Sequence, residues 1–194
     1  MSQDNLPPAT DPGWEDFKKG DRDAFAKLYD EHAPPLIVYG MRVSGEEAVV
    51  KDVVQDLFVE LWRSRAQLQS VRSVRGYLLK ALRYKLMRKA AVRLLYKEEL
   101  PEQADPVNPE AIILEHEDEI IRRQLIRRAV DRLPRRQQEV VNLRFYQGLS
   151  TEEAAEIMAV NYQSAANLLH RAVDQLRKIL GPGALTLLIL YREG

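Results

Sequence analysis

The sequence predicts an all-α fold with two small helical domains joined by an acidic, proline-containing linker. Leu, Ala, Arg and Glu are abundant, whereas the alternation of apolar and polar residues that marks strands is almost absent. Apolar residues recur at helical spacing on both sides of residues 98–116, which hold Pro101, Pro106 and Pro109 among acidic residues. A chain of 194 residues has room for one or two such domains.

The composition excludes several kinds of chemistry. The chain has no cysteine, which removes disulfides, thiolate nucleophiles and cysteine-based zinc sites and fits a reducing cytoplasm. His32, His116 and His170 lie far apart and lack metal-binding spacing, and no glycine-rich phosphate loop is present. We therefore expect no catalytic residue, no metal and no cofactor.

The ends of the chain differ in character. Residues 1–16 lack the cationic start and apolar core of a signal peptide and predict a disordered tail. Gly181 begins a helix-breaking Gly-Pro-Gly run, and the apolar stretch 184–191 follows it within the C-terminal tail 182–194. That stretch is shorter than the roughly 18 apolar residues of a membrane span. We expect it to pack on its own domain, with a partner site as the alternative.

Charge is segregated along a chain whose formal net charge is zero. From Glu15 to Glu60 acids outnumber bases by eleven to six, and from Trp62 to Lys97 there are eleven cations and no acid. Five acids and no base follow between residues 98 and 110. Such segregation predicts one surface that binds phosphates and others with different partners.

The N-terminal half predicts an amphipathic helix that starts near Phe25, after the capping candidates Asp21 and Asp23. Pro34 and Pro35 should interrupt or kink it.

A second helix begins with Glu46 and Glu47, two acids that favour the positive end of the helix dipole. Its apolar positions recur on one face: Val50, Val53, Val54, Leu57, Phe58, Leu61 and Trp62. The opposite face is polar, with Asp52, Gln55, Asp56 and Arg63. Simple solvation would explain such a face in most helices.

A third helix should start after Ser73 and combine a basic face with tyrosines. The residues displayed on the basic face are Lys80, Arg83, Lys85 and Arg88, with Tyr77 and Tyr84 nearby. Cations beside aromatic rings suit a single nucleic-acid strand. A solvated Lys/Arg face that covers core aliphatic side chains accounts for the spacing equally well.

The stretch from Leu133 to Leu180 predicts a helix-turn-helix. Ser150 and Glu153 have the spacing of a capping box, so a short helix should begin at Thr151. It should end around residues 159–161, where Asn161 can cap the next helix. Two helices joined by so tight a turn, each apolar on one face, form a helix-turn-helix of the winged-helix-like or homeodomain-like type.

The second helix of this pair should present polar side chains away from its core: Tyr162, Gln163, Asn167, His170 and Arg171. Amide, imidazole and guanidinium groups can bind base edges in a major groove or the phosphates beside it. An ordinary helical hairpin fits the pattern alone about as well.

Three motifs resemble the sigma-70 family of RNA polymerase sigma factors, specifically the extracytoplasmic-function (ECF) class. LPRRQQEVVNLRFYQGLSTEEAAEIM, followed by a short helix and HRA, resembles the C-terminal domain that binds the promoter −35 element. DVVQDLFVELW resembles the helix that docks on the clamp coiled coil of the polymerase. W-x-x-R followed by S-x-R-G-Y-L resembles the segment that recognises and melts the −10 element.

The resemblance extends from about Phe17 to Leu180 and implies a function for each part of the chain. Residues 17–97 would be region 2, residues 98–116 an acidic linker in place of a middle domain, and residues 117–181 region 4. The implied partners are core RNA polymerase and promoter DNA, and an anti-sigma factor is a further candidate.

The resemblance also assigns residues to these partners. The implied polymerase-binding residues are Asp52, Gln55, Asp56 and Arg63. The implied −10 DNA-binding residues are Trp62, Arg72, Arg75, Tyr77, Lys80, Arg83, Tyr84 and Arg88. The implied −35 DNA-binding residues are Arg144, Ser150, Thr151, Tyr162, Gln163, Ser164, Asn167, His170 and Arg171.

This chain departs from the family at four of its positions. Tyr84 and Arg88 stand where the family often has Asn and Asp, and Ala166 and Leu168 stand where it often has cations.

Two other classes of protein remain as alternatives. One is a dimeric helix-turn-helix regulator that binds duplex operators without polymerase, and the other is a helical adaptor that binds only proteins.

Overall fold

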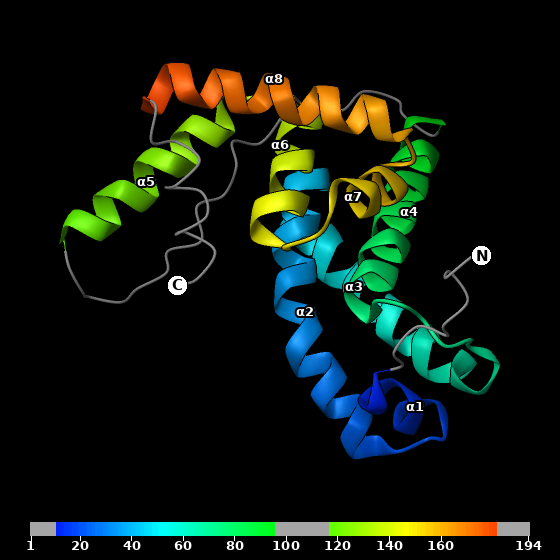
Figure 1. Ribbon diagram of the computed structural model, residues 1–194. Helices are drawn as coiled ribbons and strands as arrows, with labels where there is room; N and C mark the ends of the chain where they lie inside the picture. The colour runs from blue at the N-terminus through cyan, green and yellow to red at the C-terminus, as the bar shows by residue number, and fades with distance from the viewer. Residues whose placement is uncertain (1–10, 96–116, 182–194) are drawn as a thin grey trace, which may run out of the picture. The chain divides into compact units, whose positions relative to one another are not determined.

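The computed structural model describes residues 11–95 and 117–181, which form helices and connecting turns without any strand (Figure 1). The chain divides into two compact units at Leu100–Pro101, and we call their described parts unit 1 and unit 2. This architecture confirms the predicted all-α fold with two domains. Three predicted segments lie wholly or largely outside the described residues: the first ten residues of the tail, the linker 98–116 and the apolar tail 182–194.

Unit 1 begins with α1 (Pro12–Lys18), a helix whose first five residues the sequence analysis assigned to a disordered tail. The side chain of Asp11 caps it by accepting a backbone N–H bond at 2.8 Å, and a proline occupies the first turn. Trp14 and Phe17, three residues apart on one face, are only 1% and 0% exposed. The tail prediction is therefore wrong for residues 12–16, because a cap and two buried rings anchor this short helix.

Helix α2 (Arg22–Ser44) starts at the predicted cap Asp21 and ends at Gly45, whose left-handed φ of 79° favours glycine. The helix continues through Pro34 and Pro35, so the predicted interruption does not occur. Each proline removes one backbone donor, and the carbonyls affected belong to exposed residues that water can reach. Buried residues before and after the prolines hold the helix against the rest of unit 1: Leu28, His32, Ala33, Leu36, Tyr39 and Gly40.

Helix α3 (Glu47–Ser64) buries the apolar face that its sequence predicts. The buried residues are Val50, Val53, Val54, Leu57, Phe58 and Leu61. It crosses α2 closely at Gly40, where an added Cβ would lie 2.5 Å from Cγ1 of Val50. A larger residue at position 40 would therefore push the two helices apart.

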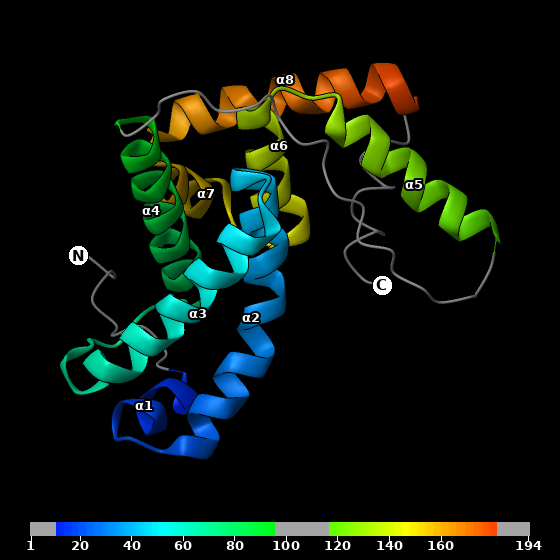
Figure 2. The same cartoon turned by 180° about the vertical axis from the view of Figure 1, so that it is seen from behind.

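A 3₁₀ turn, η1 (Arg65–Gln67), and a short loop lead to α4 (Val74–Leu95). The hydroxyl of Ser73 accepts the backbone N–H of Gly76 at 3.0 Å, as predicted for a cap. Helix α4 packs with α2 and α3 (Figure 2). Four of its leucines are buried in this core: Leu78, Leu79, Leu82 and Leu86.

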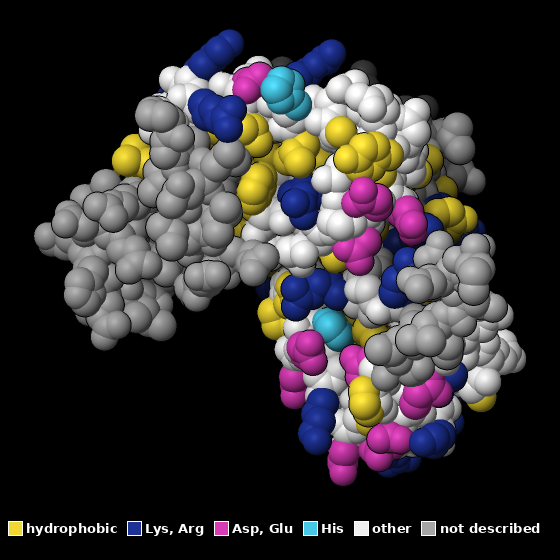
Figure 3. Space-filling view, viewed as in Figure 1, with side chains coloured by type: hydrophobic (Ala, Val, Ile, Leu, Met, Phe, Trp, Pro, Cys, Tyr) yellow, Lys and Arg dark blue, Asp and Glu magenta, His cyan; other side chains and the backbone are white. Residues whose placement is uncertain are grey.

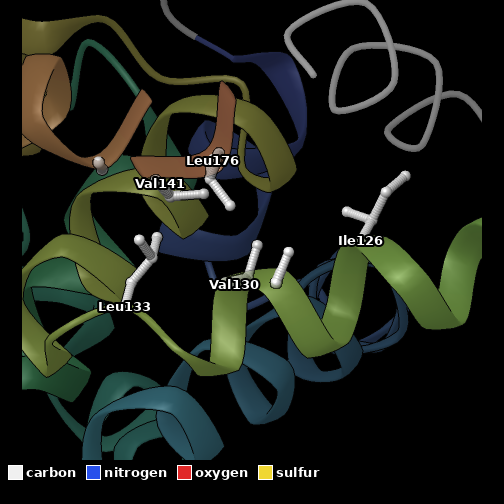
Figure 4. Packing of buried hydrophobic residues seen from close by; sticks show 7 residues of the cluster. Ile126, Val130, Leu133, Val141 and Leu176 are labelled. Atoms are coloured by element: carbon white, nitrogen blue, oxygen red, sulfur yellow. The ribbon is translucent and has the colours of Figure 1, made fainter. Parts of the chain in front are cut away.

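Unit 2 consists of α5 (Glu117–Asp131), α6 (Arg135–Val141), α7 (Thr151–Met158) and α8 (Tyr162–Leu180). A cluster of buried apolar residues joins α5 and α6 to α8 (Figure 4): Ile126, Ala129, Val130, Leu133, Val141, Ala172 and Leu176. Small residues at the contacts, such as Ala129 and Ala172, let these helices pack closely.

A π turn, η2 (Asn142–Tyr146), carries the chain from α6 toward α7. The backbone N–H of Gln147 donates to the carbonyl of Asn142 at 3.0 Å, which closes this wider turn. Both side chains are buried, so a polar contact of 3.5 Å between their amides lies inside unit 2.

Candidate nucleic-acid and protein interfaces

Helices α7 and α8 form the predicted helix-turn-helix, and its caps are those that the sequence indicates. Ser150 and Glu153 make a complete capping box, with bonds of 3.1 Å to the hydroxyl and 2.7 Å to the carboxylate. Helix α7 ends at Ala159, a non-glycine residue in the left-handed region with a φ of 52°. The side chain of Asn161 then accepts the backbone N–H of Ser164 at 2.7 Å and starts α8. Hydrogen bonds at both ends of the turn thus fix where α8 points.

The outer face of α8 presents side chains that the sequence assigns to −35 DNA. The exposed residues among them are Tyr162, Gln163, Asn167, His170 and Arg171. The side-chain amide of Gln163 donates to Oδ1 of Asn167 at 3.3 Å, so the two amides form a hydrogen-bonded pair one turn apart. Such a pair can bind base edges in a major groove.

Acidic Asp174 lies on the same helix and was absent from the predicted site. Its carboxylate lies 3.3 Å from Nε2 of His170 and 3.7 Å from Nη1 of Arg177. Figure 3 shows Lys/Arg, His and acidic side chains together on α8, across the top of the view. The four-residue spacing from His170 is the sequence signal that would have found it. An acid here lowers the net positive charge available to a phosphate backbone.

Three further residues predicted for −35 DNA lie where α7 begins. Nη1 of the half-buried Arg144 donates to the carbonyl of Leu149, so its guanidinium fastens the turn that precedes α7. The hydroxyl of Ser150 takes part in the capping box, and Thr151 is half-buried in the first turn. Arg144 and Ser150 therefore have structural contacts, and their role on DNA stays a prediction.

The polar face of α3 is exposed at all four predicted polymerase-binding positions: Asp52, Gln55, Asp56 and Arg63. A groove of about 620 Å³ runs beside this face, between α2 and α3. Gln55 and Arg63 line it together with Lys51 and with apolar and aromatic side chains, which are Phe25, Tyr29, Ile37, Val54, Phe58, Val59 and Trp62. Two of the four predicted docking residues thus line an apolar groove.

Three ion pairs join α3 and its N-cap residue Glu46 to α4. Glu60 lies 2.6 Å from Lys85, and Asp52 lies 2.5 Å from Lys89. Nη1 of Arg93 lies 2.6 Å from the carboxylate of Glu46, and this contact raises the pKa of the arginine above its ordinary value. Asp52 therefore has a partner inside unit 1, which the sequence analysis missed because the two residues are 37 positions apart.

The eight predicted −10 residues fall into two groups by burial. Trp62 packs 4.9 Å from Phe25 (ring centroids) beneath the guanidinium of Arg65, and Tyr77 packs 5.6 Å from Trp14. Burial raises the pKa of the Tyr77 hydroxyl above its ordinary value. Trp62 and Tyr77, together with Arg75 and Arg83, are half-buried, whereas the exposed members of the set are Arg72, Lys80, Tyr84 and Arg88.

Within residues 11–95 and 117–181, no helix is long and apolar enough to cross a bilayer. The same residues contain no group of three or more His, Cys, Asp or Glu side chains that could hold a metal ion.

Family comparisons match both units. The family profile of sigma-70 region 2 matches residues 28–93, and the profile of sigma-70 region 4 matches residues 123–176. The ECF RNA polymerase sigma factor SigL of Mycobacterium tuberculosis is 29% identical over 161 residues, which cover 79% of this chain and 86% of SigL. The RNA polymerase sigma factor CarQ of Myxococcus xanthus is 26% identical over 167 residues, which cover 86% of this chain and 95% of CarQ.

Two solved structures share the fold. The sigma factor RpoE of Bartonella quintana, in complex with the anti-sigma factor NepR, superposes with a TM-score of 0.60 at 20% identity. That match covers 87% of this chain and 98% of RpoE. CnrH, in complex with the cytosolic domain of CnrY, superposes with a TM-score of 0.57 at 20% identity over 87% of this chain and 94% of CnrH.

The two helical units, the helix-turn-helix and the family matches place the chain among DNA-binding proteins of transcription. The chain belongs to the sigma-70 family of RNA polymerase sigma factors, in the ECF class, because regions 2 and 4 occur in family order and together span more than half of it. It acts in transcription initiation, with core RNA polymerase and promoter DNA as partners, and the rival stand-alone regulator is not favoured.

Proposed function

We propose that this sigma factor uses three surfaces: the polar face of α3 docks on core polymerase, α4 binds the opened −10 element, and α8 reads the −35 element. The observation that carries this proposal is the exposed polar row Gln55, Asp56 and Arg63, opposite the buried face of α3 and beside the α2–α3 groove. A polar row bordering an apolar groove offers both charge complementarity and buried area to a protein partner.

The mechanism has no covalent step. Binding energy from the polymerase and promoter contacts is converted into strand separation, so the chain contributes no catalytic residue and needs no cofactor. A protein that works with core polymerase acts in the cytoplasm. We assign Asp56 and Gln55 to the polymerase, whereas Asp52 also serves the contact with Lys89.

The −35 surface should bind duplex DNA weakly on its own. Each phosphate neutralised contributes roughly −0.9 to the slope of log affinity against log salt. Arg171 and His170 are the cationic or donor groups on the outer face of α8 beside the amides, and Asp174 offsets them. Sequence preference at the −35 element should therefore appear only in the holoenzyme, where polymerase supplies the remaining affinity.

An anti-sigma factor is a further candidate partner. RpoE was solved with its anti-sigma factor NepR, and this chain shares that fold. The α2–α3 groove is the surface that such a partner would fill, since Gln55 and Arg63 line it and polymerase would then be excluded.

Gel filtration of the purified chain, alone and with core RNA polymerase, tests the proposal. A sigma factor should elute as a monomer alone and with the polymerase when both are present. A dimer that does not associate with polymerase would contradict the proposal.

A further inference from the structure

Helix α1 lies beside the segment that joins α3 to α4, which is η1 and the residues 68–73 after it (Figure 1, Figure 2). We call residues 68–73 the α3–α4 loop. Two adjacent residues of α1 bind two adjacent residues of this loop. The indole N–H of Trp14 donates to the carbonyl of Gln69 at 3.1 Å. The hydroxyl of Ser70 donates to Oε1 of Glu15 at 2.7 Å. Both contacts join residues that are 55 positions apart.

Helix α1 and the turn after it also contact the elements on either side of this loop. The ring of Trp14 is 1% exposed and meets Tyr77 of α4 edge-on, with the ring centroids 5.6 Å apart. An added Cβ at Gly20, in the turn that follows α1, would lie 3.4 Å from Nε of Arg65 in η1. The α3–α4 loop is therefore held along its length and at both of its ends.

The carboxylate of Glu15 is directed to the loop and not to solvent. Nζ of Lys18 lies 3.1 Å from Oε2 of Glu15 and 3.5 Å from Oγ of Ser70. The hydrogen bonds from Ser70 and Lys18 lower the pKa of the Glu15 carboxyl below its ordinary value. The group is therefore an ionised acceptor at neutral pH. Because Lys18 balances its charge, the pair offers no net charge to a phosphate.

The held loop carries one cation, Arg72, which is exposed and belongs to the residues predicted for the −10 element. Ser70, two residues before it, is bound by Glu15. Ser73, directly after it, caps α4 by accepting the backbone N–H of Gly76 at 3.0 Å. Fixed points on both sides restrict the backbone of Arg72. A loop that is ordered beforehand avoids the entropy loss that a mobile loop would suffer on binding.

We propose that α1 is a positioning element for promoter contact: Trp14 and Glu15 hold the α3–α4 loop so that Arg72 meets −10 DNA in one fixed place. Trp14, Glu15 and Ser70 are positioning residues, since they act through Arg72. The region 2 profile begins at residue 28, so α1 lies outside the part of the chain that it matches. The inference rests on the proposed function, because that function supplies the −10 element to which Arg72 is assigned.

Glu15 separates positioning from stability better than Trp14, which is a core residue. Its side chain is half-buried, and surface contacts of this kind contribute little to folding. Glu15→Ala removes the acceptor of the Ser70 hydroxyl, whereas Glu15→Gln keeps an oxygen acceptor. Asp16→Ala is the matched control, because Asp16 is the next acid of α1 and pairs with Lys19 at 3.0 Å.

The test measures promoter opening by holoenzyme formed from core RNA polymerase and the full chain. The template is a duplex promoter that this holoenzyme selects from random sequences, with a fluorescent base analogue in the −10 element. Glu15→Ala and Ser70→Ala should each slow opening by about 2- to 10-fold, the net effect of one hydrogen bond. The double variant should be no slower than the slower single variant. Glu15→Gln and Asp16→Ala should open the promoter at nearly the unaltered rate.

A second cycle tests whether Glu15 acts through Arg72. Arg72→Ala should slow opening, and adding Glu15→Ala to it should cause no further loss. Polymerase affinity and urea unfolding should be unchanged in these variants, whereas a purely structural role of Glu15 would alter them. In the free chain, NMR order parameters of the loop amides should fall in Glu15→Ala and not in Asp16→Ala.

The positioning role would be overturned by unaltered opening in Glu15→Ala, by unaltered order parameters of the loop, or by a further loss in the variant that also carries Arg72→Ala. A matching loss of polymerase affinity would overturn it too and make α1 a structural support. Equal losses in Glu15→Ala and Glu15→Gln would implicate the charge and not the hydrogen bond to the loop. Failure of the unaltered chain to co-elute with polymerase would refute the proposed function alone, because the order of the loop is measured without polymerase.

Discussion

The two units use their charged side chains differently. In unit 1, ion pairs such as Glu60–Lys85 cross from α3 to α4, whereas in unit 2 the pair His170–Asp174 lies within α8. A pair between helices helps to fix how two elements pack, whereas a pair within one helix stabilises only that helix, by a few tenths of a kcal/mol. Unit 1 therefore links α3 to the basic helix α4, while α8 is positioned by caps and apolar contacts.

Removing Trp14, the buried tryptophan of α1, should have the largest effect on stability. It should also show whether the two units unfold independently. Trp14→Ala deletes a side chain that is 1% exposed, and such losses typically cost about 3–5 kcal/mol. Hydrogen exchange followed separately in the two units should show faster opening of α1 to α4 and unchanged protection of α6 to α8. Equal loss of protection in both units would mean that they unfold as one.

Reversing a charge on the docking face should separate binding from stability. Asp56→Arg is expected to weaken binding to core polymerase by several kcal/mol, since like charges at an interface are costly. The stability should change by about 0.5 kcal/mol or less, because Asp56 is exposed. Titration of labelled polymerase measures the first quantity, and urea unfolding measures the second.

Asp16→Arg is the matched control for this reversal. Asp16 is an exposed aspartate on α1 whose ion pair with Lys19 is a surface contact. Its reversal should leave polymerase binding unchanged. If both reversals weaken binding equally, long-range charge and not the α3 face determines docking.

In unit 2, the amide pair of α8 should determine sequence preference. Asn167→Ala removes one member of that pair and should relax discrimination at the −35 element by about 1–3 kcal/mol per contact. Arg171→Ala should instead lower transcription across promoter sequences, because a phosphate contact carries no sequence information. Holoenzyme transcription from a set of −35 variants measures both effects. An unchanged sequence preference in Asn167→Ala would mean that Asn167 does not read the −35 element.

Much of the fold could be predicted from the sequence because its signals are local. Ser150, Glu153 and Asn161 make the caps that their spacing indicates, and the apolar residues of α3 are buried as their period requires. Local helix propensity was misleading at Pro34 and Pro35, where tertiary packing decides the structure. Helix α2 runs through both prolines because its buried residues hold it in place.

The contacts of the candidate site residues were harder to predict because they join residues distant in sequence. Asp52 and Lys89 contact each other across 37 positions, and no period within either helix reveals this. Tyr77 belongs to the predicted −10 set, yet it packs on Trp14 of α1, a helix that the sequence analysis did not expect.

The caps that position α8 can be tested at Ser150. Ser150→Ala removes the hydroxyl that accepts the backbone N–H of Glu153 and should destabilise unit 2 by about 1 kcal/mol. Ser150→Gly should cost only a few tenths of a kcal/mol. Thermal unfolding of the variants measures both changes. A loss of stability confined to unit 1 would contradict the assignment of this cap to the stability of unit 2.

The smallest expected effect concerns the ion pair between Asp52 of α3 and Lys89 of α4. Asp52 and Lys89 are 58% and 40% exposed in their side chains, so their coupling in a double-mutant cycle should be about 0.2–1 kcal/mol. Asp52→Asn and Lys89→Gln should each lower the free energy of unfolding slightly, and the double variant should lose little more. High salt should reduce this coupling, since the pair is open to solvent.

The same variants decide what Asp52 does in docking. If its main contact is Lys89, Asp52→Asn should weaken polymerase binding much less than Asp56→Asn, which neutralises another exposed acid one turn further along α3. Lys89→Gln should then change polymerase affinity as little as Asp52→Asn does. If Asp52→Asn matches Asp56→Asn while Lys89→Gln has no effect, Asp52 contacts the polymerase directly. The ion pair would then have to open on docking, which would leave Lys89 available to DNA when polymerase is bound.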